Sequence, residues 1–520
     1  MTTTRTQPAT APGREAGHQG PLTGAVAGLL SLGTFLGIAE LAASFVGPTA
    51  APAIAVGQRT IDAAPHELKE FAVRAFGEAD KLVLLVGIFT TLALLSAAAG
   101  VVAARRLPIG LGALVLLSAV TALAAVTAPT GRLLDALPAG LGGLAAAGVL
   151  HLLLAARPAA DGTSPGQPLS RRALLRYGVA IATGAAAAGA LGRRLLADAG
   201  RAAASRAGLV LPAPASPAPP PVGDPQVAGA VPFYTPNADF YRVDTALTVP
   251  EVDAGTWSLR ISGMVDRPVT LSLDDLLARP LVERDITLTC VSNEVGGPYV
   301  GNARWTGVLL APLLEELGVQ SGAEQVLSRS VDGWTCSTPT SAITDGRDAM
   351  LAVAMNGEPL PLEHGFPVRM VVPGLYGYVS ATKWVTELEL TTFDETAYWT
   401  TRGYAAQAPI KLSSRIDTPK PLAKLPVGPV AIGGVAWAQG IGIDAVEVSI
   451  DGGPWQRARL AGEAGVDTWR QWVLPWDATA GSHRLVVRAT DKAGQTQTAD
   501  RAPIFPDGAT GRQEVLVTVA

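Results

Sequence analysis

Residues 288–305 read LTCVSNEVGGPYVGNARW and contain Cys290, one of only two cysteines in the 520-residue chain. In the run DITLTC that ends at this cysteine, a period of two places Ile286, Leu288 and Cys290 on one face of a predicted strand. A buried structural cysteine would suit that pattern, whereas a nucleophile would need a base such as histidine and a zinc site several more ligands. The glycines that follow let the backbone approach a ligand closely, and a thiolate suits a soft metal. The residues alone leave these interpretations open, and they make the turn after Cys290 a candidate site.

Length and composition limit the classes of protein that this chain can belong to. A chain of 520 residues is too long for one core, so we expect several domains. The formal net charge of −4 argues against a dedicated nucleic-acid binder. Two cysteines in different sequence neighbourhoods cannot form a disulfide framework, and we interpret Cys336 as structural. The first 200 residues are rich in Ala, Leu, Gly and Val, whereas the remainder has an ordinary soluble composition.

The apolar first part of the chain predicts a bundle of transmembrane helices. A membrane span needs roughly 20 mainly apolar residues. Lys and Arg accumulate on the cytoplasmic side, so the paired arginines in ARRLP and SRRALLR place the residues after the last span outside the cytoplasm. We therefore expect a multi-pass protein of the cell membrane with an extracytoplasmic soluble part. Five stretches approach the required length, namely 22–46, 82–103, 108–128, 140–156 and 174–192.

Two stretches of this part have further interpretations. The mixed charges and Pro65 within residues 59–81 predict a small amphipathic helix on the outer surface. The run SRRALLRYGVAIATGAAAAGALG resembles a twin-arginine export signal, and it equally suits an ordinary basic flank of a membrane span. Glu40 lies inside the first predicted span, where an acid is either functional or buried by neighbouring helices.

The remaining sequence predicts a linker and two soluble domains. We place the membrane region at 1–200, an Ala/Pro-rich linker at 201–231, and the two domains at 232–404 and 405–520. The prolines of LPAPASPAPPPVGDP in the linker predict an extended spacer rather than a packed element. Strand runs such as WSLRISG and DITLTC mix with helical runs such as LDDLLAR and LLAPLLEELG in the first domain, which is typical of an α+β fold. The runs DAVEVSI, HRLVVRATD and EVLVTVA predict an all-β sandwich for the second.

The stretch around Cys290, continued by GNARW.GV.L..LL, resembles the molybdenum-cofactor domain of the sulfite oxidase family. The resemblance runs from about Phe233 to the C-terminus and implies a molybdopterin-binding catalytic domain at 232–404. It also implies molybdenum–molybdopterin as the cofactor, with Cys290 as the protein ligand of molybdenum. The activity that it implies is oxygen-atom transfer coupled to two-electron transfer. The C-terminal runs VAIGGVAWAQG and VEVSIDGGPWQRARL look like the family's immunoglobulin-like dimerisation domain, which implies a homodimer.

Four more stretches carry the resemblance and imply a set of site residues. FYRVD (240–244) is similar to the segment that meets the pyranopterin and the substrate anion, and an arginine fork suits such an anion. MNGEPLPLEHGFPVRMVVPG (355–374) matches the segment that holds the cofactor's phosphate, and VSATKW (379–384) matches the segment that holds the pterin. WTTRGY (399–404) is similar to the element that carries an active-site tyrosine. The resemblance thus implies Arg242, Asp244, His364, Arg369, Ser380, Thr382 and Lys383 as cofactor-binding residues, and Cys290, Arg242 and Tyr404 as catalytic residues.

The sequence also departs from the family pattern. Vertebrate-like and plant-like members of the family that the chain resembles follow the ligand cysteine with a sulfite-binding arginine, whereas here CVSNEVGG places Val295 or a neighbour at that position. Oxidation of sulfite to sulfate is the first expectation, reduction of a sulfoxide such as oxidised methionine is the second, and a non-catalytic membrane-tethered binding module is the third. The chain has no CxxCH motif, and only His151 lies within a predicted span, so we expect no haem in this chain and a separate electron-transfer partner.

Overall fold

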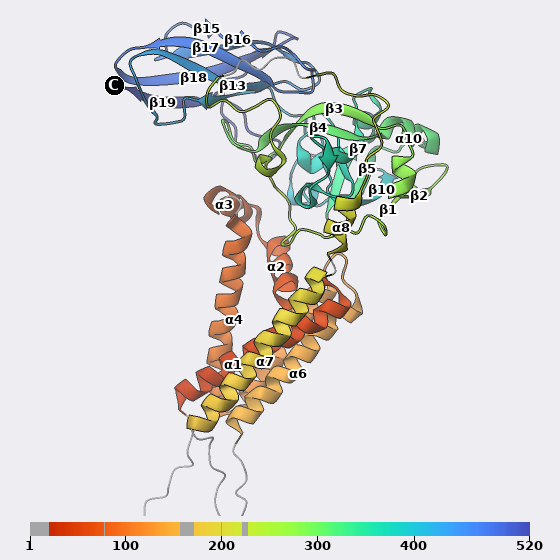
Figure 1. Cartoon of the computed structure of the whole chain (residues 1–520), viewed down its shortest axis with the longest axis vertical. Coiled ribbons are helices and arrows are strands. Elements are labelled where there is room, and N and C mark those ends of the chain that lie inside the picture. Colours follow the sequence, from red (N-terminus) through yellow and green to blue (C-terminus); the bar gives the residue numbers. More distant parts are fainter. Residues whose placement is uncertain (1–19, 77–78, 156–170, 199, 221–226) are drawn as a thin grey trace, which may run out of the picture. The chain divides into compact units, whose positions relative to one another are not determined.

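The computed structural model describes residues 20–76, 79–155, 171–198, 200–220 and 227–520. The chain divides into two compact units, residues 1–199 and 200–520 (Figure 1). Residue 156 of the fourth predicted span, Ser170 of the arginine-rich run and residues 221–225 of the proline-rich run lie outside the described residues.

The first unit is a bundle of long helices around α1 (Pro21–Val46). Close approach of the backbones explains why glycines recur on α1. A Cβ atom added to Gly28 would lie 2.0 Å from the carbonyl oxygen of Ser96, and one added to Gly100 would lie 2.1 Å from that of Gly24. Such small residues let neighbouring helices touch along their backbones. The helices packed against α1 are α4 (Asp80–Arg105), α6 (Leu137–Leu154) and α7 (Arg171–Asp198), and α5 (Leu107–Val126) packs against α4 and α6.

Four helices among the described residues are long and apolar enough to cross a membrane. They are Pro21–Val46, Asp80–Arg105, Leu107–Val126 and Leu133–Leu154, where the last begins with the 3-10 turn η3 (Leu133–Ala136). The fifth predicted span forms α7 but is not one of these four. Alanine and glycine dominate it and arginines lie at both of its ends, so it is the weakest of the five as an apolar stretch. The residues predicted as one amphipathic helix form α2 (Pro52–Ala63) and α3 (His66–Phe76), which Pro65 separates.

The second unit begins with α8 (Arg201–Gly208), and the proline-rich segment that follows packs against the sheet. Ser216 forms an isolated parallel bridge with Val282. The amide of Ala215 donates to the carbonyl of Leu281 (2.8 Å), and the amide of Glu283 donates to the carbonyl of Ser216 (2.8 Å). The segment is extended, as its prolines predict. It is nevertheless packed, because the edge of a strand offers its backbone partners, and the prediction of an unpacked spacer is wrong for these residues.

Two sheets form the α+β domain. The first has the strand order β2 (Val269–Ser272), β1 (Ser258–Gly263), β10 (Val385–Thr391), β5 (Gln325–Ser330) and β6 (Thr335–Pro339). The second has the order β3 (Val282–Thr289), β4 (Val300–Leu309), β7 (Met350–Met355) and β8 (Glu358–Pro359), and β9 (Arg369–Val371) pairs with β7. The helices between these strands are α9 (Leu273–Leu277), α10 (Leu310–Leu317) and α11 (Thr340–Thr344). Leucines spaced three and four apart bury one face of α10, and Gly318 ends it with a φ of +71°.

The C-terminal region is a β-sandwich. One sheet has the order β11 (Ser413–Thr418), β13 (Gly428–Trp437), β17 (Arg470–Ala478) and β16 (Arg459–Leu460). The other has the order β12 (Lys424–Leu425), β19 (Glu514–Val519), β18 (Gly481–Asp491), β14 (Ile443–Ile450) and β15 (Gln456–Arg457). Alternate residues of both sheets share one apolar core that includes Ile432, Val448, Trp472, Val487 and Val517. Figure 1 shows the sandwich in blue beside the green α+β domain.

Candidate functional site

Strand β3 ends one residue before Cys290, and a tight turn follows. The amide of Cys290 donates to the carbonyl of Tyr299 (3.0 Å), and the amide of Asn293 donates back to the carbonyl of Cys290 (3.0 Å). The side chain of Asn293 accepts a bond from the amide of Tyr299 (2.9 Å), which closes the turn. The thiol is buried, with 9% of the residue exposed. We call residues 290–299 the cysteine turn.

Burial dominates the electrostatics of the thiol. It raises the pKa of Cys290, while a hydrogen bond from the amide of Ser292 to the sulfur (3.4 Å) and the positive charge of Lys383 act in the opposite direction. Burial, assisted by the charge of a Cys290 thiolate, also raises the pKa of Tyr241. The thiol is therefore protonated at neutral pH in the protein alone, and its surroundings include an aromatic hydroxyl.

A group of cationic side chains surrounds the carboxylate of Asp244. Nε of Arg242 and Nζ of Lys383 each lie 2.9 Å from its Oδ2 atom. Lys383 also donates to the carbonyl of Glu363 (3.1 Å). Burial lowers the pKa of Lys383 to about 8, although the carboxylate of Asp244 acts in the opposite direction. One carboxylate thus serves two cations, and this group retains a net positive charge at neutral pH.

His364 and Arg369 lie at the two ends of a second turn, residues 364–369, and both are almost fully buried. Nε2 of His364 lies 3.0 Å from the carbonyl oxygen of Asn237, whereas its Nδ1 atom has no hydrogen-bond partner among the described residues. Nη1 of Arg369 donates to the carbonyl of His364 (3.2 Å), and its Nε atom has no partner in the described part of the chain. Buried nitrogens are normally satisfied by hydrogen bonds, so these two atoms make His364 and Arg369 candidate ligand-binding residues.

The turn between them depends on Gly365. Its φ of +108° lies in the region that favours glycine, and an added Cβ would lie 3.0 Å from the Cα of Lys383 and 3.1 Å from the Cβ of Arg369. The glycine therefore lets the turn that carries His364 lie directly against the segment that carries Lys383.

Burial and neighbouring cations set the charge of the two residues. Burial, together with the charges of Lys383, Arg369 and Arg242, lowers the pKa of His364 to about 3. Burial lowers the pKa of Arg369 to about 10, and its guanidinium lies 4.9 Å from the centre of the Trp305 ring. His364 is thus neutral and Arg369 is charged at physiological pH. An anion that enters here meets positive charge from the lysine and the arginines.

The hydroxyls of Ser380 and Thr382 have partners within the protein. Ser380 donates to the carbonyls of Leu375 (3.0 Å) and Tyr376 (3.1 Å). The hydroxyl of Thr382 lies 2.6 Å from that of Ser328. Both residues are fully buried and hold the 379–384 segment against its neighbours. Their side chains therefore shape this segment, and their predicted role in cofactor binding stays a prediction.

Tyr404 lies in an aromatic cluster. Its ring is 5.2 Å from that of Trp399, 5.3 Å from that of Tyr378 and 5.3 Å from that of Phe505. A different tyrosine, Tyr376, interacts electrostatically with the Cys290 thiol, as Tyr241 does. Burial raises its pKa to about 12, and the charge of a Cys290 thiolate contributes to that rise.

Sequence reasoning missed several residues of this site. Tyr241 stands beside Arg242 in FYRVD, Trp305 ends GNARW, and Tyr376 lies in the run LYGY just before VSATKW. Phe240 packs edge-on against both Trp305 and His364. Each of these aromatic residues lies in or next to a stretch that contains a predicted site residue. Their position in the sequence, beside a predicted cofactor-binding residue, could therefore have identified them.

A protein-family model matches the part of the chain that contains most of this site. The family model described as the oxidoreductase molybdopterin binding domain matches residues 246–399. The sulfite oxidase of Gallus gallus is 30% identical over 322 residues, which cover 52% of this chain and 70% of that protein. The mitochondrial sulfite oxidase of Homo sapiens is 31% identical over 322 residues, but the match spans only 59% of its length.

A bacterial oxidoreductase and the solved structure of a dehydrogenase are also similar to this chain. The uncharacterized oxidoreductase YuiH of Bacillus subtilis is 36% identical over 152 residues, which cover 29% of this chain and 74% of that protein. The crystal structure of the sulfane dehydrogenase SoxCD from Paracoccus pantotrophus superposes with a TM-score of 0.50 and 25% sequence identity. That superposition covers 55% of this chain and 82% of the other.

Proposed function

The chain belongs to the sulfite oxidase family of molybdopterin-binding oxidoreductases, and we propose that it is a membrane-anchored member in which Cys290 ligates molybdenum. Membership makes it an oxidoreductase with a molybdenum–molybdopterin cofactor and oxygen-atom transfer as its class of chemistry. The observation that carries the assignment of the site is the buried Cys290 thiol, on which the charge of Lys383 acts. Lys383 in turn belongs to a cationic group with unpartnered buried nitrogens beside it.

The residues present fit the cofactor. Its phosphate is an anion, and Nδ1 of His364 and Nε of Arg369 are buried nitrogens without partners in the described part of the chain. Arg369 and Lys383 supply positive charge, and Arg242 shares the carboxylate of Asp244 with Lys383. A phosphate that accepts hydrogen bonds from Nε of Arg369 and from the ammonium of Lys383 would satisfy the orphaned arginine nitrogen and offset the buried charge, and Nδ1 of neutral His364 would accept a hydrogen bond from a hydroxyl group of the cofactor.

Each residue of the site has a distinct role in this proposal. The cofactor supplies the redox chemistry when bound, and the protein supplies binding, orientation and electrostatics. Cys290 supplies the thiolate ligand and must give up its proton to do so. His364, Arg369 and Lys383 hold the cofactor, while Ser380 and Thr382 keep their segment in place through internal hydrogen bonds. The Arg242 side chain is 29% exposed and can reach a substrate anion, whereas Tyr404 is nearly buried.

Sulfite is the first substrate that we propose, because the relatives with the longest matches are sulfite oxidases. A sulfoxide is the second, and the surroundings of Cys290 favour it. Two tyrosines, Tyr241 and Tyr376, are electrostatically coupled to the thiol, and Lys383 is the cation whose charge acts on it. Aromatic side chains beside the thiol suit a neutral sulfoxide, whereas the cationic group around Asp244 suits the anionic cofactor or a small anion.

Three further features belong to the proposal. The four apolar helices support anchoring in the cell membrane, with the second unit on the extracytoplasmic side. The C-terminal sandwich is proposed to be immunoglobulin-like and to form a homodimer. A separate electron-transfer partner would exchange electrons with the site.

Metal analysis of the full chain in detergent tests the site, with protein made in cells that synthesise the cofactor. We expect about one molybdenum per chain in the wild type and a large loss of turnover in Cys290→Ser with an unchanged fold. Cys336→Ser is the matched control, because Cys336 is the chain's other cysteine and is also buried, in the apolar core of the α+β domain. A fully active Cys290→Ser enzyme would contradict the ligand assignment. Assays of sulfite oxidation and methionine sulfoxide reduction with artificial redox dyes then separate the two substrates.

A further inference from the structure

The C-terminal sandwich holds strand β3 at Thr287, three residues before Cys290. The amide of Thr287 donates to the carbonyl of Asp467 (3.0 Å), and its carbonyl accepts from the side chain of Gln439. Its hydroxyl accepts from the amide of Trp469 (2.7 Å) and donates to the side chain of Asn302 (3.0 Å). Thr287 is fully buried, so residues of the sandwich satisfy both of its backbone groups and bind its hydroxyl.

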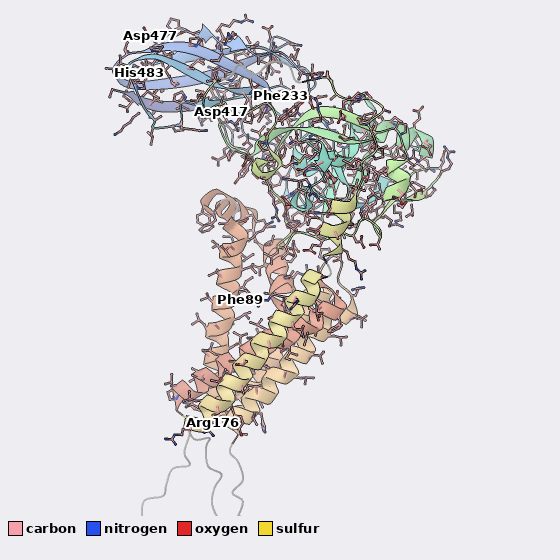
Figure 2. All side chains as sticks on the ribbon, in the orientation of Figure 1. Phe89, Arg176, Phe233, Asp417, Asp477 and His483 are labelled. Atoms are coloured by element: carbon pink, nitrogen blue, oxygen red, sulfur yellow. The ribbon has the colours of Figure 1, made fainter. Side chains whose placement is uncertain are left out.

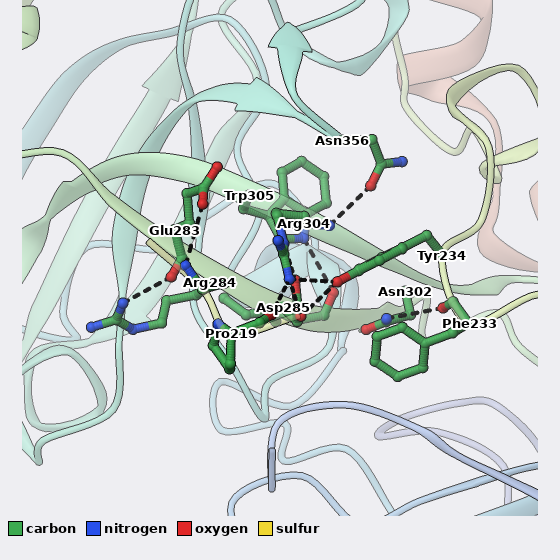
Figure 3. Close-up of polar contacts among 12 residues, drawn as sticks. Pro219, Phe233, Tyr234, Glu283, Arg284, Asp285, Asn302, Arg304, Trp305 and Asn356 are labelled. Carbon is green, nitrogen blue, oxygen red and sulfur yellow. Dashed lines mark hydrogen bonds and ion pairs between the residues drawn. The ribbon is translucent and has the colours of Figure 1, made fainter. Parts of the chain in front are cut away.

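Neighbouring contacts reinforce this attachment. The side chain of Asn302 donates to the carbonyl of Phe233 (3.0 Å), as Figure 3 shows, and the indole of Trp469 donates to the same carbonyl (3.0 Å). Val300, which begins the strand after the cysteine turn, packs in an apolar cluster with Val435, Trp437 and Trp469 of the sandwich. Figure 3 also shows the cross-strand pair of Asp285 and Arg304, which links β3 to β4 on the same side.

A second attachment lies within the cysteine turn itself. Nη1 of Arg415, on β11 of the sandwich, donates to the carbonyl of Gly297 (3.0 Å), and Nε of the same guanidinium lies 2.7 Å from Oδ1 of Asp417. The two side chains are 9% and 3% exposed. The Gln513 side chain packs against Gly296, where an added Cβ would lie 2.6 Å from it. Figure 2 labels Asp417 and Phe233 at this end of the sandwich.

These two attachments bracket Cys290, and the second is costly to make. Burying a charged pair removes the hydration of both ions, which a hydrophobic pair would avoid. The Arg415 guanidinium uses its fork to bind Asp417 through one nitrogen and the turn through another, which a lysine cannot reproduce. Without Arg415, the carbonyl of Gly297 would lose its charge-assisted hydrogen bond. This carbonyl lies in the cysteine turn, whose conformation sets the position of the Cys290 thiol.

We propose that Arg415, oriented by Asp417, is a positioning residue that fixes the cysteine turn and thereby the direction of the Cys290 thiol. The sandwich then has a role beyond the proposed dimerisation, because it completes the support of Cys290. The inference rests on the proposed role of Cys290. Its test measures the thiol in protein without cofactor, so it can fail or succeed independently of that role.

The test uses the full chain in detergent, purified from cells that cannot make the cofactor. The rate at which iodoacetamide alkylates Cys290 is followed by mass spectrometry of the tryptic peptide. We expect Arg415→Lys to raise that rate at least tenfold over the wild type, and Arg415→Met to raise it further. Arg470→Lys is the matched control, because Arg470 also donates to two backbone carbonyls, those of Ala461 (3.0 Å) and Ile443 (2.8 Å), but inside the sandwich.

The outcomes are distinct. A rate in Arg415→Lys within twofold of both the wild type and Arg470→Lys would overturn the proposal, because the pair would then only stabilise the interface. Equal increases in Arg415→Lys and Arg470→Lys would overturn it as well, since loosening of the sandwich would explain both. If Arg415→Met does not fold, Asp417→Asn replaces it and should give an increase smaller than that of Arg415→Lys. Wild-type protein without molybdenum from a cofactor-competent host would refute the proposed function and leave these rates interpretable.

Discussion

The ammonium nitrogen of Lys383 lies 2.9 Å from Oδ2 of Asp244, and this ion pair joins two segments that are 139 residues apart in the chain. Arg242 shares the same carboxylate. One carboxylate lies between two cationic side chains, so the site keeps a net positive charge that favours an anion. The carboxylate also offsets part of the repulsion between the two cations.

Asp244→Asn should lower the pKa of Lys383 below about 8, because the carboxylate favours the charged ammonium and burial already disfavours it. Only the neutral amine is acetylated, so the midpoint of the pH–rate curve for Lys383 should move to lower pH. Pulse acetylation of the cofactor-free chain followed by mass spectrometry measures it. Glu363→Gln is the control, because its carbonyl still accepts from Lys383 and its curve should not move. Equal curves for Asp244→Asn and the wild type would show that the ion pair is not formed in solution.

His364 should make the folded protein less stable as the pH falls from about 6.5 towards 3. Its pKa is about 3 in the folded protein and near 6.5 in the unfolded chain, so the unfolded state binds more protons in this window and stability rises with pH. The slope from this group alone approaches about 1.4 kcal/mol per pH unit. Urea unfolding followed by tryptophan fluorescence reports the second unit, because all ten tryptophans lie at or after Trp257. His364→Gln should lose this part of the slope, and an unchanged slope would contradict a buried neutral histidine.

Gly365→Ala should destabilise the second unit by roughly 1–3 kcal/mol and reduce the molybdenum content. The added methyl meets Lys383 and Arg369 in addition to the strain of a positive φ. Gly357→Ala is a matched control, because Gly357 has a φ of +84° and no atom within 4 Å of its added Cβ. Urea midpoints of the two variants separate crowding from backbone strain, and equal losses would mean that crowding at Gly365 has no cost.

Gly28→Val should destabilise the helical bundle of the first unit by at least about 1–3 kcal/mol, because the side chain would overlap the carbonyl of Ser96. Gly33→Val on the same helix is the control, since nothing lies within 4 Å of a Cβ at Gly33. The fraction of monodisperse chain that survives heating in detergent, measured by size exclusion, should fall for Gly28→Val alone. Similar losses in both variants would contradict the close contact of α1 and α4.

Local patterns predicted the strands and helices well because their signals lie within a few residues. DITLTC falls in β3 and the position that follows it, LLAPLLEELG contains α10, and HRLVVRATD falls within β18. The period of two also placed Ile286 and Leu288 in the core. It could not show that Thr287 and Thr289 on the opposite face are buried too, and for Thr287 the reason is that its contacts come from the C-terminal sandwich.

The candidate site was predictable only through resemblance, since its ion pair and its turns join segments far apart in the sequence. Polar residues such as Arg242, His364 and Lys383 were predicted, and the structure brings them together. The proline-rich segment shows what composition alone does not predict. Its composition predicted extension correctly, but composition carries no information about a strand edge that offers hydrogen bonds to it.

Strand β3 is an edge strand of its sheet, and an uncovered edge is a template on which another chain can add a strand. Here the proline-rich segment occupies the backbone groups of Leu281 and Glu283, and the sandwich occupies those of Thr287. The same contacts that support the cysteine turn therefore also protect the catalytic sheet from self-association. A chain that has lost its C-terminal sandwich would expose the part of this edge at Thr287 together with Val300, which adds a surface on which another chain could pair.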